Sequence, residues 1–344
     1  MADINTPSRR RAWRRTDDHT PGVAKLQLVT EDLPPLTPTS VLIKVHAAAL
    51  NYRDANIANG RIIGNDAAGE VIALGQHVTR VKAGDRVAPI TDTQFLNDRS
   101  PGRSWLAANE DGVLADYIVY DQEVLGRLPD YLPWENACLL PNAGCTAWSA
   151  LKGVGIGKSV LIQGTGGVSS WALKLSRAAG LKVILTSSSD DKLERMKKRF
   201  GHPEIQTINY AKFPNWDEEV LKMTDGVGVD LTIDNGGASS VVRSMKSTRR
   251  GGIVSQVGYL GNHKEPPQLQ ELIPTIIDRR IVYRGINAGS VFDLDDLSAA
   301  LESTRMSLDD IIDTVYPFEQ AEEAMQSLWE GKVVGKLVLS SIHR

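Results

Sequence analysis

The sequence has few cysteines, no long apolar run and no excess of charge of one sign. Its two cysteines, Cys138 and Cys145, are too few for a disulfide framework, which favours a reduced, cytoplasmic location. No stretch approaches the roughly 18 consecutive apolar residues of a membrane helix. Neither end resembles a secretory signal. A net charge of −3 disfavours a nucleic-acid surface. We expect no membrane and no nucleic-acid partner.

One basic run stands out against this balance, at Arg9, Arg10, Arg11, Arg14 and Arg15. Acidic residues precede and follow the run, and no apolar segment comes after it as in a targeting signal. We interpret it as the start of a solvent-exposed strand, with a basic tail as the alternative.

The length of 344 residues exceeds what one hydrophobic core usually fills, so we expect two domains. The first 137 residues are predicted to be rich in β-structure. Ser40–Ala49 and Gly69–Leu74 are β-branched runs bounded by turn residues. This part of the chain is typical of a twisted, barrel-like domain.

From Gly157 onwards the pattern changes to strands that alternate with helices. Predicted strands are Ser159–Gln163, Lys182–Thr186, Val229–Ile233 and Gly252–Val257, and predicted helices are Ser169–Ala179 and Asp191–Phe200. Such alternation predicts a parallel sheet with right-handed crossovers. After Gly289 two helices and a closing strand at Lys336–Ser340 follow, and we expect this tail to return to the first domain.

A glycine-rich loop follows the first of these strands, at Gly164, Thr165, Gly166, Gly167, Val168 and Ser169. The loop indicates cofactor binding because a strand precedes it and a helix follows it, whereas glycine patterns alone often occur by chance. Gly164 suits the tight turn, and Gly166 lets the backbone approach a pyrophosphate at the helix N-terminus. A plain structural turn is the alternative.

The next strand ends at Ser187, Ser188 and Ser189, where a carboxylate would bind the ribose 2′-hydroxyl of NAD. Small hydroxyl residues there leave room for a 2′-phosphate, which Lys192 would neutralise. Asp190 and Asp191, which follow directly, favour NAD(H) instead. We therefore favour NADP(H), with NAD(H) as the weaker alternative and a solvent-exposed role as the alternative for Lys192.

These stretches together resemble the medium-chain dehydrogenase/reductase superfamily, in particular its zinc-free branch of quinone-oxidoreductase-like and fungal alcohol-dehydrogenase-like proteins. The resemblance lies in Val41–Asp54, Ala67–Ala88, Gly144–Leu151, Ser159–Glu194 and Gly335–Leu339. It implies an α/β protein with a Rossmann doubly wound parallel sheet at 138–291. A GroES-like, β-rich catalytic domain would be formed from both chain ends, 1–137 and 292–344.

The resemblance also implies a set of cofactor contacts. Gly166, Gly167 and Val168 would bind the pyrophosphate, and Ser188, Lys192 and Tyr210 a 2′-phosphate. Tyr210 has an ordinary strand-end aromatic as its alternative. The further implied contacts are Thr146 on the nicotinamide side, Gly258 and Tyr259 in the cofactor cleft, and Asn287 and Lys336 late in the chain.

Metal-dependent relatives hold a catalytic zinc with cysteine and histidine. The corresponding positions here are Asn51, Asn65 and Asn142, and carboxamides are poor zinc ligands. The four-cysteine lobe of those relatives is also missing. We therefore predict no zinc.

Without a metal, hydride transfer needs hydrogen-bond donors for the developing oxyanion. Asn51, Tyr52 and Asn142 are the candidates, and Tyr52 is the candidate proton donor, with a packed structural tyrosine as its alternative. Asp54 and Asp66 are expected to be turn or cap residues. The segment from Gly60 to Asp66 is shorter than in relatives, and this puts a proton donor from that loop in doubt.

The favoured reaction is reduction by NADPH of a conjugated C=C or C=O in a hydrophobic enone or quinone, with secondary metabolism as one setting. Alcohol oxidation or carbonyl reduction competes with it. A non-redox catalyst or a cofactor-binding protein on the same fold is an alternative of another class. A cleft lined from Phe95 to Trp105 and around Phe292 would suit an apolar small molecule. The family also implies a homodimer through an edge strand at Ile281–Ile286.

Overall fold

A computed structural model describes residues 7–18, 25–56, 60–259, 261, 268–340 and 342–343. The chain divides into two compact units. One comprises Met1–Cys145 and Ala288–Arg344, and the other comprises Thr146–Asn287. The second unit lies inside the range 138–291 predicted for the cofactor domain.

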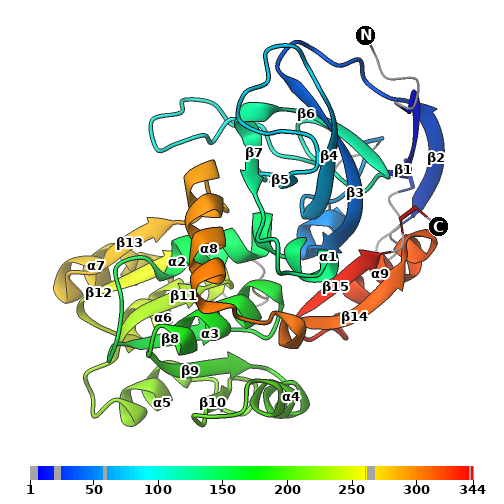
Figure 1. Cartoon of the computed structure of the whole chain (residues 1–344). Helices are drawn as coiled ribbons and strands as arrows, with labels where there is room; N and C mark the ends of the chain where they lie inside the picture. The colour runs from blue at the N-terminus through cyan, green and yellow to red at the C-terminus, as the bar shows by residue number, and fades with distance from the viewer. Residues whose placement is uncertain are drawn as a thin grey trace. The chain divides into compact units, whose positions relative to one another are not determined.

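The second unit is built on a parallel sheet of six strands. In chain order these are β8 (Ser159–Gln163), β9 (Lys182–Ser187), β10 (Gln206–Asn209), β11 (Val229–Asp234), β12 (Thr248–Gln256) and β13 (Val282–Gly285). They lie side by side in the order β10-β9-β8-β11-β12-β13, with every pair parallel (Figure 1). This is the strand order of dinucleotide-binding folds. The direction of winding reverses between β8 and β11, and ligands of such sheets bind at the carboxyl ends of the strands beside that point.

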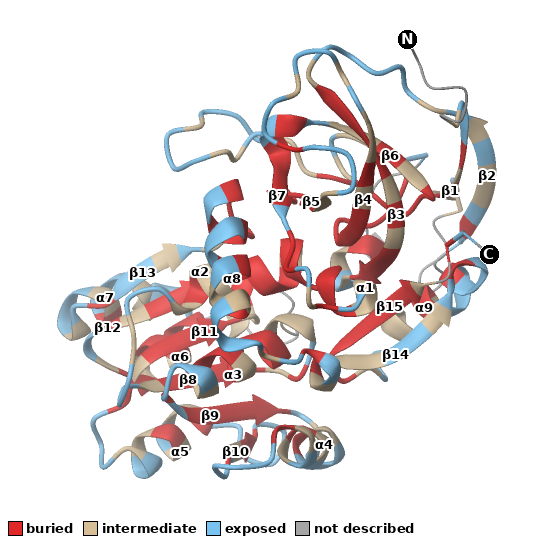
Figure 2. Ribbon diagram, viewed as in Figure 1, coloured by how far each residue is buried: buried red, intermediate tan, exposed pale blue. Residues whose placement is uncertain are grey.

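Helix α2 (Cys145–Leu151) precedes β8, and five helices connect the strands: α3 (Gly167–Ala178), α4 (Asp190–Phe200), α5 (Trp216–Met223), α6 (Val241–Ser247) and α7 (Leu272–Arg279). The central strands are buried, as Figure 2 shows, because helices cover a parallel sheet on both faces. Leu161 of β8, for example, packs in one cluster with Ile184, Ile208, Trp216 and Val220. The apolar runs read from the sequence are therefore the core strands of this unit.

The first unit is a seven-stranded sheet with a separate two-stranded ribbon. Its strands are β1 (Arg9–Arg15), β2 (Leu26–Asp32), β3 (Ser40–Leu50), β4 (Ala67–Leu74), β5 (Arg86–Pro89), β6 (Tyr117–Asp121), β7 (Leu125–Arg127), β14 (Ile312–Pro317) and β15 (Lys336–Ser340). The sheet runs β14-β15-β3-β4-β5-β7, β6 pairs with β3, and β1 pairs with β2. Its helices are α1 (Trp134–Ala137), α8 (Val291–Thr304) and α9 (Ala321–Trp329).

The pairing of β15 with β3 brings the two ends of the chain together in this unit. The strands are antiparallel, with Leu337 opposite Leu50. Lys336 at the start of β15 and Asn51 just after β3 therefore lie side by side. This register positions the polar cluster described below.

The arginine run forms strand β1 as predicted, but the expectation of solvent exposure is wrong for Arg10. This side chain is only 6% exposed and forms ion pairs with Glu31 and Asp111. Arg14 bonds to the same two carboxylates. The run therefore fastens the β1-β2 ribbon within its own unit.

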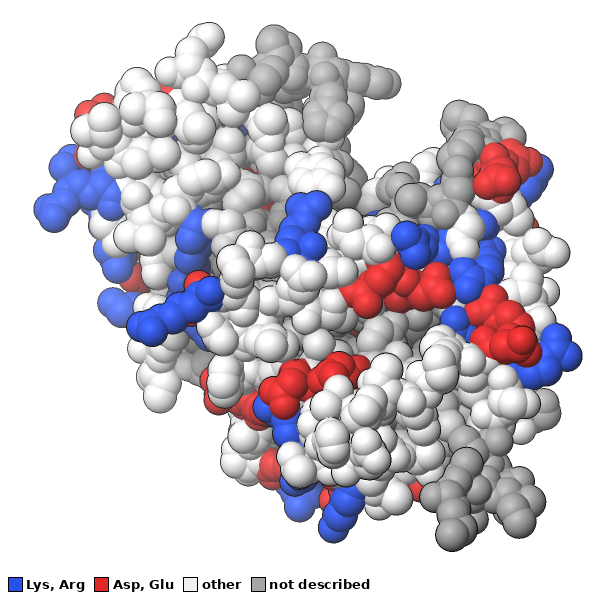
Figure 3. All heavy atoms as spheres, turned by 90° about the horizontal axis from the view of Figure 1, so that it is seen from above, with Lys and Arg blue, Asp and Glu red and all other residues white. Residues whose placement is uncertain are grey.

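The charged side chains do not separate by sign on the face shown in Figure 3, where acidic and basic groups lie interspersed. Such a face offers no extended basic surface for a polyanion. Within the described ranges, no helix is both long enough and apolar enough to cross a bilayer.

Candidate functional site

The glycine loop has the geometry of an anion-binding turn. Gly164 has a φ of +83°, a conformation that other residues adopt only with strain, and its N–H donates to Thr186 O at 2.7 Å. Gly166 is the N-cap of α3. A β-carbon built on Gly166 would meet no heavy atom of the described residues within 4 Å, so these residues leave open space beside this backbone. The N–H groups of the first turn of α3 are available to an anion there.

Ser169 fills the third position of the glycine motif by hydrogen bonding. Its buried hydroxyl donates to Gln163 O at 2.8 Å, and Asn235 Nδ2 donates to the same carbonyl at 2.7 Å. The first turn of α3 is thus tied to the end of β8 and to the residue that follows β11.

A buried carboxylate organises the neighbouring strand ends, and the sequence reasoning missed it. Asp234 Oδ1 accepts hydrogen bonds from the backbone N–H groups of Gly236 and Gly237 at 3.0 and 2.8 Å. Its Oδ2 accepts from Gln163 Nε2 at 3.3 Å and from Ser244 at 2.6 Å. The available signal was an aspartate directly before Asn-Gly-Gly at the end of a buried strand.

The residues predicted to bind a 2′-phosphate gather at the ends of β9 and β10. Tyr210 N–H donates to Ser187 O at 3.0 Å, and the Tyr210 residue is 43% exposed. Ser188 is exposed beside it. Lys192 lies in the first turn of α4, where its backbone N–H donates to the cap residue Ser189 at 3.4 Å. The structure therefore brings Ser187, Ser188, Lys192 and Tyr210 to one edge of the sheet.

Asp190, one of the two acidic residues that argued for NAD, is held by two partners that the sequence reasoning missed. Asn209 Nδ2 donates to Asp190 Oδ1 at 2.7 Å, and Lys212 forms an ion pair with Oδ2. The hydrogen bonds from Lys212 and then from Asn209 lower the pKa of Asp190. Its negative charge is therefore matched by a neighbouring cation.

The remaining predicted cofactor residues divide between buried and exposed positions. Thr146 is 5% exposed at the start of the second unit. Gly258 N–H donates to Asp234 O at 3.3 Å, next to Tyr259, which is 75% exposed. Gly237 and Tyr259 approach so closely that a β-carbon on Gly237 would come within 2.8 Å of Tyr259 Cα. Asn287 is exposed at the end of this unit.

A buried polar cluster lies in the first unit, centred on Asp66 and Lys336. Lys336 Nζ donates to Asp66 Oδ2 at 2.8 Å and to Asn51 Oδ1 at 2.7 Å. Asp66 and Lys336 are 0% and 2% exposed. Lys336, predicted as a late cofactor contact, thus directs its ammonium at residues of its own unit.

The three asparagines that the sequence singled out converge on this cluster. Asn51 Nδ2 donates to Asn65 Oδ1 and to Asp66 Oδ2, each at 2.8 Å. The backbone N–H of Asn142 donates to Asp66 Oδ1 at 2.6 Å. The expectation that Asp66 is a turn or cap residue is wrong, because its carboxylate is the acceptor that gathers these groups.

Asp54 and Tyr52 lie on the short helix η1 (Tyr52–Asn56), beside the cluster. Asp54 Oδ2 accepts from Asn51 N–H at 2.7 Å, which closes the turn as expected. Burial raises the pKa of Asp54 to about 6. The Tyr52 ring is 43% exposed and lies parallel to Trp329, with ring centroids 6.5 Å apart.

The donors in this cluster do not fit zinc. Zinc sites use thiolate, imidazole and carboxylate donors, whereas Asn51 and Asn65 offer amides. A cation, the Lys336 ammonium, already lies 2.7 Å from Asn51 Oδ1. Burial raises the pKa of the Cys138 thiol well above its usual value, which disfavours a thiolate. Across the described ranges, no group of three or more His, Cys, Asp or Glu residues could hold a metal ion.

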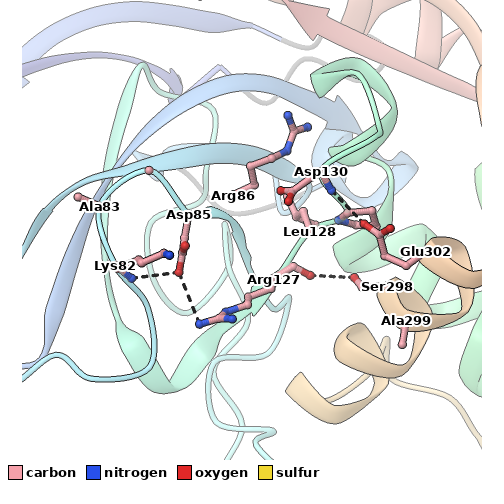
Figure 4. Close-up of a pocket in the computed structure, with 12 residues that line it drawn as sticks. Lys82, Ala83, Asp85, Arg86, Arg127, Leu128, Asp130, Ser298, Ala299 and Glu302 are labelled. Carbon is pink, nitrogen blue, oxygen red and sulfur yellow. Dashed lines mark hydrogen bonds and ion pairs between the residues drawn. The ribbon is translucent and has the colours of Figure 1, made fainter.

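A separate polar hollow of about 510 Å³ also lies in the first unit (Figure 4). Its charged groups pair with their neighbours: Asp85 with Arg127 at 3.6 Å, and Glu302 with the backbone N–H of Asp130 at 3.1 Å. The residues that line it include none of the predicted site residues. The candidate site residues therefore lie in the polar cluster of the first unit and in the glycine loop of the second, outside this hollow.

Two family models match the chain. Residues 37–130 match the alcohol dehydrogenase GroES-like domain, and residues 167–305 match the model described as zinc-binding dehydrogenase. A zinc-type alcohol dehydrogenase-like protein of Schizosaccharomyces pombe is 37% identical over 322 residues, which cover 88% of this chain and 91% of the relative. A D-arabitol-phosphate dehydrogenase of Enterococcus avium is 25% identical, over 93% of this chain and 96% of the relative.

Solved structures agree with this assignment. An NAD-dependent alcohol dehydrogenase superposes with a TM-score of 0.82 at 27% identity, covering 96% of this chain and 99% of that one. The 2-octenoyl-CoA carboxylase reductase CinF, from a Streptomyces species, shares the fold with a TM-score of 0.84 at 20% identity, covering 98% and 88%. The predicted fold class is confirmed. The chain belongs to the medium-chain dehydrogenase/reductase superfamily and is an oxidoreductase.

Proposed function

We propose that this oxidoreductase uses NADPH, without zinc, to reduce a conjugated C=C or C=O in a hydrophobic organic substrate. The observation that carries the proposal is the glycine loop, which opens α3 beside the point where the sheet reverses its winding. Gly166 and the first turn of α3 would hold the pyrophosphate of a dinucleotide. The bound nicotinamide would supply the hydride.

The preference for NADPH rests on the edge formed by β9 and β10. Lys192 and Tyr210 would bind a 2′-phosphate, as the sequence resemblance implies. The pairing of Asp190 with Lys212 supports this reading, because a paired carboxylate repels a phosphate less than a free one. NADH is the weaker alternative, and the NAD-dependent relative with 27% identity favours it.

Independence from zinc rests on the types of donor in the polar cluster. Two carboxamides, a carboxylate and an ammonium are joined by hydrogen bonds, and the Lys336 ammonium supplies the positive charge that faces Asp66 in this cluster. Dialysis against a chelator should therefore leave activity unchanged. Loss of activity on dialysis, restored by zinc alone, would contradict this part of the proposal.

An apolar substrate is supported by large rings that the first unit leaves exposed. Phe292 on α8 is 64% exposed, and Tyr52 is 43% exposed. Carbonyl reduction and alcohol oxidation are the second candidate reactions, after conjugate reduction. The relatives named as alcohol dehydrogenases support these two reactions.

Two measurements test the proposal in order. Calorimetry with NADPH and with NADH should show binding, tighter for NADPH. Consumption of NADPH is then followed by the loss of absorbance of the reduced nicotinamide, with a panel of enones, quinones, aldehydes and ketones. Turnover of aldehydes but not enones would favour the second function. Tight NADPH binding without turnover of any substrate would indicate the non-redox alternative.

We also propose a homodimer formed through β13. This strand is at the edge of the sheet of the second unit, and Val282 and Tyr283 on it are 53% and 43% exposed. Ile273 and Ile277 on α7 add exposed apolar surface in the same unit. An unpaired edge strand with apolar neighbours suits pairing with a second copy. Sedimentation that gave the mass of a monomer would contradict it.

A further inference from the structure

The direction of each hydrogen bond in the polar cluster is fixed by Lys336. An ammonium group donates hydrogen bonds and accepts none. The atom of Asn51 that lies 2.7 Å from Nζ must therefore be the carbonyl oxygen Oδ1. The NH₂ group of Asn51 must then be on the other side of its amide.

This orientation passes on to Asn65. Asn51 Nδ2 directs one N–H at Asp66 Oδ2, which also accepts from Lys336, and the other at Asn65 Oδ1. Both N–H bonds of Asn51 are thereby used inside the cluster. Another residue must therefore donate the hydrogen bond to the oxyanion that was predicted for Asn51. Because Asn65 accepts with its oxygen, its own NH₂ group is the last donor in a series of hydrogen bonds that runs from Lys336 through Asn51 to Asn65.

Among the residues that the structure describes, none accepts a hydrogen bond from the end of this series. Asn65 is 0% exposed, and its Nδ2 is a buried donor with no hydrogen-bond partner in that part of the chain. A buried donor left unpaired costs on the order of 1–3 kcal/mol, so such atoms call for a functional explanation. The atom has almost no exposed surface, so the group that pairs with it must be small, such as a single oxygen atom.

We propose that the Asn65 amide donates a hydrogen bond to the carbonyl oxygen of the substrate, and that Lys336 is a positioning residue that acts on it through Asn51. The inference rests on the proposed function and names the residue that binds the substrate oxygen. Asn51 is bonded to the cation at one end and to Asn65 at the other. In a low-dielectric interior such a series polarises each successive N–H, which strengthens the terminal donor.

The chemistry of the step follows from this donor. A hydride adds to the electrophilic carbon, the π electrons move onto the carbonyl oxygen, and the oxyanion so formed accepts the hydrogen bond from Asn65. Protonation by water completes the reduction, so one hydride and one proton are added in total. The amide stays neutral throughout, and its donor is already oriented before the charge develops.

The main test compares two buried asparagines of the first unit. Asn65→Ala and the isosteric Asn65→Leu should lower kcat on the order of 100-fold, the usual effect of losing one oxyanion donor. The Kd for NADPH should stay unchanged. Asn136 is the matched control, since it is 3% exposed and its Nδ2 already donates to Asp309 at 2.8 Å. Asn136→Ala should lower the melting temperature and leave kcat within about threefold.

The positioning role of Lys336 needs a readout that a structural role would not change. Lys336→Arg keeps a group that only donates and should retain most of kcat, whereas Lys336→Gln and Lys336→Met should lower it. In the double variant with Asn65→Leu, the Lys336→Met change should cause no further loss, because both act on one donor.

The outcomes separate the two proposals. If the wild type turns over substrate and both Asn65 variants keep its kcat, an ordered water is the partner of Asn65 and the inference is overturned. Additive losses in the double variant would overturn the role of Lys336. If none of the carbonyls or enones tested leads the wild type to oxidise NADPH, the proposed function fails, and the inference fails with it.

Discussion

Asp54 is predicted to weaken the fold at neutral pH, because its carboxylate is fully buried. One oxygen, Oδ2, accepts from Asn51 N–H, but Oδ1 is buried and has no hydrogen-bond partner among the described residues. Burial raises the pKa of this group from 3.8 to about 6, against Arg53 and the Asn51 N–H, which lower it. Replacing Asp54 by Asn keeps the shape of the neutral acid and removes the charge.

The size of the effect follows from the shift in pKa. The native state retains the proton of Asp54 up to about pH 6, whereas the unfolded chain loses it near pH 3.8. Stability is therefore greatest below the lower value, falls as the pH rises through this window, and stays reduced above it. About two pKa units correspond to about 3 kcal/mol. Asp54→Asn should thus raise the free energy of unfolding by up to about 3 kcal/mol at pH 8 and by almost nothing at pH 4.

Urea titrations of the wild type and of Asp54→Asn at several pH values between 4 and 8 measure this difference. Asp98→Asn is the control, since Asp98 is an exposed loop residue whose replacement should alter stability little at any pH. The reasoning is refuted if Asp54→Asn destabilises the protein at pH 8 as much as at pH 4. That result would mean that neighbouring cations compensate fully for the burial of the carboxylate.

Three further predictions concern the cofactor and the site. Lys212→Met should weaken NADPH binding relative to NADH on the order of tenfold by calorimetry, because it leaves Asp190 unpaired. Adding Asp190→Asn should restore the preference, and a double variant that stays shifted toward NADH would contradict this. Tyr52→Phe should lower kcat if the phenol orients or protonates the substrate. Unchanged kinetics would mean that Tyr52 only packs against Trp329. Asp234→Ala should lower the free energy of unfolding by about 3 kcal/mol in urea, because several buried donors lose their acceptor.

The second unit could be predicted closely from the sequence, because local patterns determine it. Its strands are continuous apolar runs, which is what a parallel sheet covered on both faces requires. The predicted strand Ser159–Gln163 has the same bounds in β8, and the predicted helix Asp191–Phe200 differs from α4 by one residue. The glycine loop could be identified for the same reason, since strand, loop and helix are adjacent in the chain.

Contacts that depend on distant pairing were the ones that sequence reasoning missed. Arg10 lies in a strand as its neighbours suggested, yet its burial depends on Asp111, which is 101 residues away. A run of arginines in the sequence cannot reveal acidic partners that far along the chain. Lys212 was missed because an exposed lysine after a strand is ordinary, and only the fold brings it to Asp190.

Lys336 shows most clearly why the role of a site residue is harder to predict than its presence. A lysine at the start of a late strand suits a cofactor phosphate and a buried carboxylate equally well. The difference depends on which way the side chain points, and side chains alternate between the two faces of a strand. In this unit β15 pairs with β3, so that Leu337 faces Leu50 across the sheet and Lys336 meets Asn51 and Asp66. A slip of one residue in that register would turn the ammonium to the opposite face. The partners of Asn51 and the direction of every hydrogen bond up to Asn65 therefore depend on strand pairing between residues 285 positions apart, which a local sequence pattern does not encode.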